Sequence, residues 1–167
     1  MPTEFRPKIQ VPLKKIDYII ELIAMILLLS SWIYSIQTYH SLPDIIPTHF
    51  DIHGQVDDNG SKGTLFIMPI IFSVVYLLLT ILNTKPQSFN FPVKITEENA
   101  AIQYQFATRL LRVMKTLIGW TILSICWIIN SSARQGNLPV GEWLVFVDIA
   151  LVFVPIIIYV IVARKHK

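Results

Sequence analysis

The residues best suited to chemistry lie in a polar segment, residues 40–63, between two long apolar runs. Within it, His49, Asp51 and His53 alternate with apolar residues. If Thr48–Val56 is extended, alternate side chains share one face of the strand, so the two imidazoles and the carboxylate point the same way. These ligands could bind zinc or another divalent metal and leave one coordination position open.

The same segment also has a plainer interpretation. The His-x-Asp-x-His spacing is not a specific metal signature, so the alternative is a hydrogen-bonded polar loop whose Phe50 and Ile52 pack against helix ends. The run Asp57–Gly60 predicts a turn in which Gly60 is available for positive φ. Cys126 is the single cysteine, which excludes a disulfide framework and a cysteine metal cage, and its apolar surroundings predict a packing role. We expect no obligatory cofactor.

Four apolar runs must position this segment, because a spanning helix needs roughly 20 mostly apolar residues. They cover about residues 16–39, 64–82, 116–132 and 143–162. Charged residues make up 15% of the chain and apolar residues 53%, whereas a soluble domain has roughly 25% charged residues. We therefore predict an all-α membrane protein. It is a single membrane domain over residues 1–167, a four-transmembrane-helix bundle with a structured outer loop between helices 1 and 2.

The distribution of Lys and Arg predicts the orientation of the four helices, since these residues concentrate on the cytoplasmic side. Twelve of the 14 fall before the first run, between the second and third, or after the fourth, and the other two are Lys62 and Arg134. Both termini are therefore expected in the cytoplasm and segment 40–63 outside, in a plasma membrane. The first run is too long for a signal peptide and is interpreted as an uncleaved anchor.

The outer segment also carries a dense motif, LPD-x-IP-x-HF followed by a glycine, an aspartate and GSK. This motif resembles the signature of a bacterial membrane family, a domain of unknown function that also forms the N-terminal part of SdpI-type immunity and signalling proteins. The similarity extends to about residue 115. It implies a sensing, binding or immunity role for the outer loop, with these binding candidates: Pro43, Asp44, Pro47, His49, Phe50, Gly54, Asp57, Gly60, Ser61 and Lys62.

The cytoplasmic segment, residues 83–115, predicts a loop followed by an amphipathic helix at the membrane surface. Thr96 is a plausible N-cap, and the helix could run unbroken into the third span. Arg109, Arg112 and Lys115 recur at i, i+3 and i+6, so neighbours share a face. They are candidates for contact with a lipid headgroup, a phosphate or an acidic partner. The alternative is simple anchoring by positive charge.

Two acidic residues fall within the apolar runs and need compensation there. Glu21 is expected to form an ion pair with nearby basic residues. Asp148 is expected either to be solvated at the interface or to pair with Lys62, Arg134 or a histidine of the outer loop.

These features favour a non-catalytic membrane protein that senses, binds or protects through its outer loop. The alternatives are a small membrane enzyme or metal-binding protein using His49, Asp51 and His53, and a subunit of a transporter. The expected partners are the lipid bilayer and a secreted peptide, protein or membrane partner at the loop. The sequence leaves a homo-oligomer open. No basic stretch interleaved with aromatic residues suggests nucleic acid.

Overall fold

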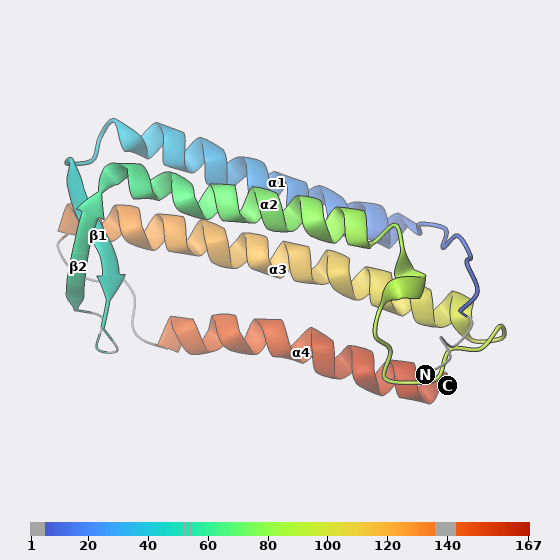
Figure 1. Cartoon of the computed structure of the whole chain (residues 1–167). Coiled ribbons are helices and arrows are strands. Elements are labelled where there is room, and N and C mark those ends of the chain that lie inside the picture. Colours follow the sequence, from blue (N-terminus) through green and yellow to red (C-terminus); the bar gives the residue numbers. More distant parts are fainter. Residues whose placement is uncertain (1–5, 52, 54, 136–142) are drawn as a thin grey trace.

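The computed structural model describes residues 6–51, 53, 55–135 and 143–167, without the side chains of residues 143–146 and 149. In chain order its elements are α1 (Lys15–Tyr39), β1 (Ile45–Phe50), β2 (Val56–Ser61), the 3₁₀ helix η1 (Lys62–Phe66), α2 (Ile67–Leu82), the 3₁₀ helix η2 (Pro86–Ser88), α3 (Ala100–Gln135) and α4 (Trp143–Lys165). The four α-helices run side by side, the β1–β2 hairpin closes one end of the bundle, and the last turn of α4 lies at the other (Figure 1).

Within the described residues, three helical segments are long and apolar enough to cross a membrane: Lys15–Tyr39, Lys62–Leu82 and Ala100–Gln135. Many large apolar side chains of α1 and α2 are exposed, as expected for helices surrounded by lipid. The chain is therefore a membrane protein with at least three candidate spans. The fourth predicted span coincides with α4, which lies antiparallel to α3, and its crossing of the membrane stays a prediction.

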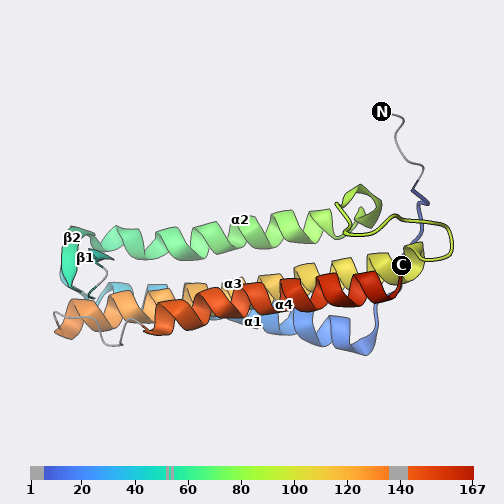
Figure 2. The same cartoon turned by 90° about the horizontal axis from the view of Figure 1, so that it is seen from below.

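Helix α3 is the element that the other three helices share. It contacts α1, α2 and α4, and α4 runs along it on the side away from α2 (Figure 2). Gly119 of α3 allows one close approach, since a Cβ there would lie 2.5 Å from Cζ of Phe72 and 3.0 Å from Cβ of Leu27. Small residues at helix contacts of this kind are typical of membrane bundles. Cys126 is buried in the same core, as predicted.

The predicted cytoplasmic helix and third span form one continuous helix, α3. Just before it, the side chains and backbone amides of Thr96 and Asn99 exchange hydrogen bonds of 2.9 and 3.3 Å, which confirms a capped start near Thr96. The amphipathic character of this segment at the membrane surface stays a prediction. Gln103 and Tyr104 on this segment are fully buried against other parts of the protein.

The outer segment folds as an antiparallel hairpin, with Ile45 opposite Ser61 and Phe50 opposite Val56. The predicted turn at Asp57–Gly60 is wrong, because these residues belong to β2. The reversal occurs earlier, where the Asp51 carboxylate accepts hydrogen bonds from two backbone amides, those of residues 53 and 55, both at 2.8 Å. An aspartate bonding to the backbone ahead of it stabilises a turn there, and this decides the register.

Candidate functional site

The hairpin is held to the bundle by an apolar contact on its inner side. Ile46 is fully buried and Leu42 and Leu65 nearly so, and they form one cluster. The end of α3 contributes Ile129 and Ala133 to this cluster. Burying an isoleucine or leucine stabilises by about 1.5–3 kcal/mol, so these contacts fix the hairpin as part of the bundle rather than leaving it a free loop.

The base of the hairpin is closed by two residues of the motif. The Lys62 ammonium lies 2.9 Å from an Asp44 carboxylate oxygen, and the Lys62 amide donates to the Asp44 carbonyl at 2.9 Å. The same ammonium lies 5.0 Å from the centre of the Tyr39 ring. Because the Asp44 side chain is 92% exposed, the ion pair itself adds little stability. Its effect is to align the strands at the point where they join α1 and η1.

Two further motif residues shape the strand and its exit. The Ser61 hydroxyl accepts a hydrogen bond from the Gly63 amide, and its carbonyl accepts one from the Thr64 hydroxyl, which starts η1. Gly60 lies in β2 beside Thr48, where a Cβ would come within 2.9 Å of the Thr48 methyl. Gly60 therefore allows Thr48 to approach the strand closely, and it lies in β2 and not in a turn.

His49 and Asp57 face each other across the two strands, with His49 Nδ1 2.6 Å from Asp57 Oδ1. The His49 side chain is 68% exposed. Asp51 is instead engaged by the backbone of the turn. In the part of the chain that the structure describes, no three His, Cys, Asp or Glu side chains are grouped closely enough to hold a metal. The predicted metal triad with His53 stays a prediction.

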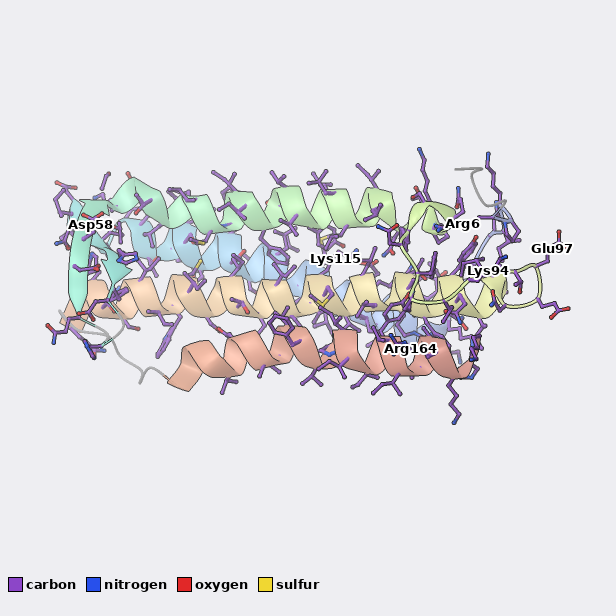
Figure 3. The ribbon with its side chains drawn as sticks, turned by 60° about the horizontal axis from the view of Figure 1, so that its bottom comes forward. Arg6, Asp58, Lys94, Glu97, Lys115 and Arg164 are labelled. Atoms are coloured by element: carbon purple, nitrogen blue, oxygen red, sulfur yellow. The ribbon has the colours of Figure 1, made fainter. Side chains whose placement is uncertain are left out.

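The remaining motif residues have mixed positions. Pro43 is exposed, whereas Pro47 and Phe50 are half-buried within β1. Gly54 and Ile52 lie outside the described residues. The motif thus divides into residues that build the hairpin and residues whose polar groups remain at its surface. This exposed surface consists of His49, Asp57, Asp58 and Asn59. Figure 3 shows Asp58 at the hairpin end of the molecule.

A second polar cluster lies inside the bundle, toward the opposite end. The Lys115 ammonium is fully buried and contacts both Glu21 oxygens, at 2.6 and 2.7 Å, and the Thr80 hydroxyl at 3.0 Å. It also lies 4.5 Å from the centre of the Tyr76 ring. Arg112 Nε lies 3.3 Å from the same carboxylate. The cluster joins α1, α2 and α3, and Figure 3 shows Lys115 between the helices. This confirms the expected ion pair of Glu21.

Arg109 makes a separate ion pair with Asp17, at the start of α1. Its Nε and Nη2 donate to the two carboxylate oxygens at 2.7 and 3.2 Å, and the Lys14 amide donates to the same carboxylate at 2.9 Å. The sequence interpretation missed Asp17, although an acidic residue in a first helical turn opposite a basic triplet was a usable signal. Arg109, Arg112 and Lys115 therefore meet the chain's own carboxylates, and contact with an external anion stays a prediction.

A chain of polar groups also connects the bundle with the hairpin end. The Asn130 amide donates to the Tyr34 hydroxyl at 2.6 Å, and Arg134 donates to Asn130 at 3.3 Å and to the Ser41 hydroxyl at 2.7 Å. Arg134 and Lys62 are thus engaged elsewhere. Asp148 Oδ1 is buried without a hydrogen-bond partner among the described residues, so the expected pairing with either residue is wrong.

The comparisons with known proteins agree with a membrane domain of unassigned role. Residues 26–72 match the family described as "Domain of unknown function (DUF1648)", and the match covers the second half of α1, the hairpin and the first part of α2. An "Uncharacterized protein" of Archaeoglobus fulgidus is 29% identical over 151 residues, with 81% of each chain covered. No solved structure matches the chain. The relation to SdpI-type proteins stays a prediction from the motif.

Proposed function

We propose that this chain is a non-catalytic membrane protein that uses its hairpin as a rigid recognition surface for a secreted peptide or protein. The observation that carries the proposal is the division of the hairpin into two sides. Ile46 on the inner side is fully buried against the bundle, whereas His49, Asp57 and Asp58 present hydrogen-bonding groups to solvent. A surface held in one conformation loses less entropy on binding than a mobile loop would.

The orientation that this role requires has support from the charges. Nine of the 14 Lys and Arg residues lie at the end opposite the hairpin, and Arg109, Arg112 and Lys115 lie in the half of α3 nearer that end. Only Lys62 and Arg134 lie near the hairpin. We infer four crossings of the plasma membrane, with both termini cytoplasmic and the hairpin outside. The antiparallel course of α4 beside α3 supports the fourth crossing (Figure 1).

The chemistry of the surface favours a cationic partner. Segment 40–63 contains one Lys or Arg residue, Lys62, and four aspartates: Asp44, Asp51, Asp57 and Asp58. Complementary charge accelerates the encounter with a basic peptide and excludes acidic ones. An immunity role against a basic secreted peptide would be one such case.

The first test concerns orientation. Because Cys126 is buried, a cysteine introduced at Asn59 or Lys85 is the accessible thiol in each variant. A membrane-impermeant maleimide added to intact cells should label Asn59→Cys and leave Lys85→Cys unlabelled until the cells are opened. The reverse pattern would place the hairpin in the cytoplasm and refute the proposal.

The second test concerns binding. A photo-crosslinking amino acid at Asn59 in native membranes should yield a crosslinked product that the same group at Lys85 does not yield. Asp57→Asn with Asp58→Asn should abolish this product if the acidic surface holds the partner. Equal crosslinking from both positions, or a product unaffected by the two substitutions, would contradict a recognition role.

The other roles predicted from the sequence have less support. An enzyme would need groups arranged around the His49–Asp57 pair, and a transporter would need charges distributed across the bilayer. In the described part of α1–α3, the charged clusters of Asp17 and Glu21 both lie toward one end.

A further inference from the structure

A pocket of about 990 Å³ lies at the end of the molecule opposite the hairpin. One wall is the segment of residues 92–99, which leads into α3, and the other is the end of α4 and the residues after it. Its polar lining consists of Lys94, Thr96, Glu98, Asn99, Arg164, His166 and Lys167. Figure 3 shows Lys94 and Arg164 in this half of the molecule, beyond Lys115.

Hydrogen bonds hold each wall of the pocket, one pair to α3 and one bond within segment 92–99 itself. The buried Gln103 amide nitrogen donates to the carbonyls of Ala163 and His166, both at 2.9 Å, which holds the end of α4 in place. On the other wall, the Asn99 amide nitrogen donates to the Lys94 carbonyl at 3.0 Å. The pocket is therefore built by contacts between distant parts of the chain and is not a gap at a loose terminus.

The charge of the pocket is positive. Lys94, Arg164 and Lys167 contribute three cations and Glu98 one carboxylate. Within the described ranges, Arg164 and Lys167 form no ion pair, unlike Arg109, which is engaged by an acidic residue of α1. The pocket adjoins both the N-terminal turn of α3, whose dipole favours negative charge, and the last turn of α4, whose dipole opposes it, so the charge argument depends on the cationic side chains.

We propose that this pocket binds the phosphate group of an anionic molecule. A guanidinium and an ammonium supply charge-assisted hydrogen bonds to phosphate oxygens. The phosphate has two sources, a lipid headgroup or a soluble phosphate compound. Arg164 follows directly after the apolar run that ends at Ala163, which places the pocket at headgroup depth if α4 spans the membrane.

The test uses the purified full-length protein in a neutral detergent. Binding of three probes is measured by thermophoresis: short-chain phosphatidylglycerol, short-chain phosphatidylcholine and inorganic phosphate. The pocket variant carries Arg164→Gln and Lys167→Gln. The control variant carries Lys85→Gln and Lys165→Gln, which removes the same charge from exposed residues that do not line the pocket.

We expect the wild-type and control proteins to bind phosphatidylglycerol and the pocket variant to bind it at least tenfold more weakly. Glu98→Gln should strengthen binding, because it removes the one carboxylate of the lining. Binding of phosphatidylglycerol alone identifies a lipid headgroup, and binding of inorganic phosphate as well identifies a free phosphate site. Equal losses in the pocket and control variants, equal binding of phosphatidylcholine, or no binding of either phosphate-bearing anion would overturn the proposal.

Discussion

Glu21 and Lys115 form an ion pair, and we predict that replacing Glu21 destabilises the protein more than replacing Lys115. Replacing Glu21 by Gln leaves Lys115 and Arg112 without the carboxylate that both approach, at 2.6 and 3.3 Å. Replacing Lys115 by Met leaves that carboxylate beside Arg112 and fills the space with an unbranched apolar chain. The first variant should therefore lose more stability than the second.

The structure allows rough magnitudes. Removing one partner of a buried ion pair costs about 3–5 kcal/mol, because the other charge is left uncompensated. The Lys115 side chain is 0% exposed, whereas the Glu21 side chain is 27% exposed and some of its charge is solvated. We expect Glu21→Gln to cost about 3–4 kcal/mol, and Lys115→Met about 1–2 kcal/mol because Arg112 remains as a partner. The double variant should cost less than the sum of the two.

The free energy of unfolding is measured by steric trapping of the purified protein in bilayer discs. Glu97→Gln and Lys165→Met are matched controls, since both residues are exposed, and each should change the free energy of unfolding by less than about 0.5 kcal/mol. Equal losses for Glu21→Gln and Lys115→Met would refute the role given to Arg112. Losses no larger than those of the controls would refute the buried network itself.

Three other perturbations test the packing and the hairpin. Gly119→Ala should cost about 1–3 kcal/mol by overpacking against Phe72, whereas Gly63→Ala, whose Cβ would meet its nearest atom at 3.7 Å, should cost little in the same unfolding measurement. Ile46→Ala should release the hairpin at a cost of about 2–5 kcal/mol. The release should appear as faster protease cleavage within residues 50–56. Unchanged cleavage would show that the apolar cluster does not hold the hairpin. The metal hypothesis predicts that zinc raises the melting temperature of the wild type but not of His49→Ala with His53→Ala. Identical wild-type curves with and without zinc would exclude it.

Several residues of the family-like motif build the hairpin, a structural role that their position in a polar loop did not suggest. Asp44 and Lys62 close the base of the hairpin, Ser61 starts η1, and Gly60 admits Thr48. These residue types are thus explained by folding before any ligand is considered. The search for a partner is better directed at the exposed polar surface beside them.

A similar distinction applies to the basic residues. Arg109 and Lys115 attract attention in the sequence because they lie close together, yet both are paired inside the bundle. Arg164 and Lys167 contributed in the sequence only to the predicted orientation, and they line a pocket because the end of α4 packs against α3. The spacing of basic residues along the chain therefore did not predict which of them form ion pairs within the bundle and which line the pocket.

The sequence by itself determined the helical membrane class and the positions of the helices, because hydrophobic length and charge act locally along the chain. It also predicted the capped start near Thr96, where the cap is made by neighbouring residues. Only the tertiary structure decided that Ile46 is the hairpin residue buried against the end of α3, because that contact joins parts of the chain that are far apart in the sequence. It likewise decided that Glu21 meets Lys115. Such pairings depend on how α1, α2 and α3 rotate to bury small residues such as Gly119, and no local pattern specifies that rotation.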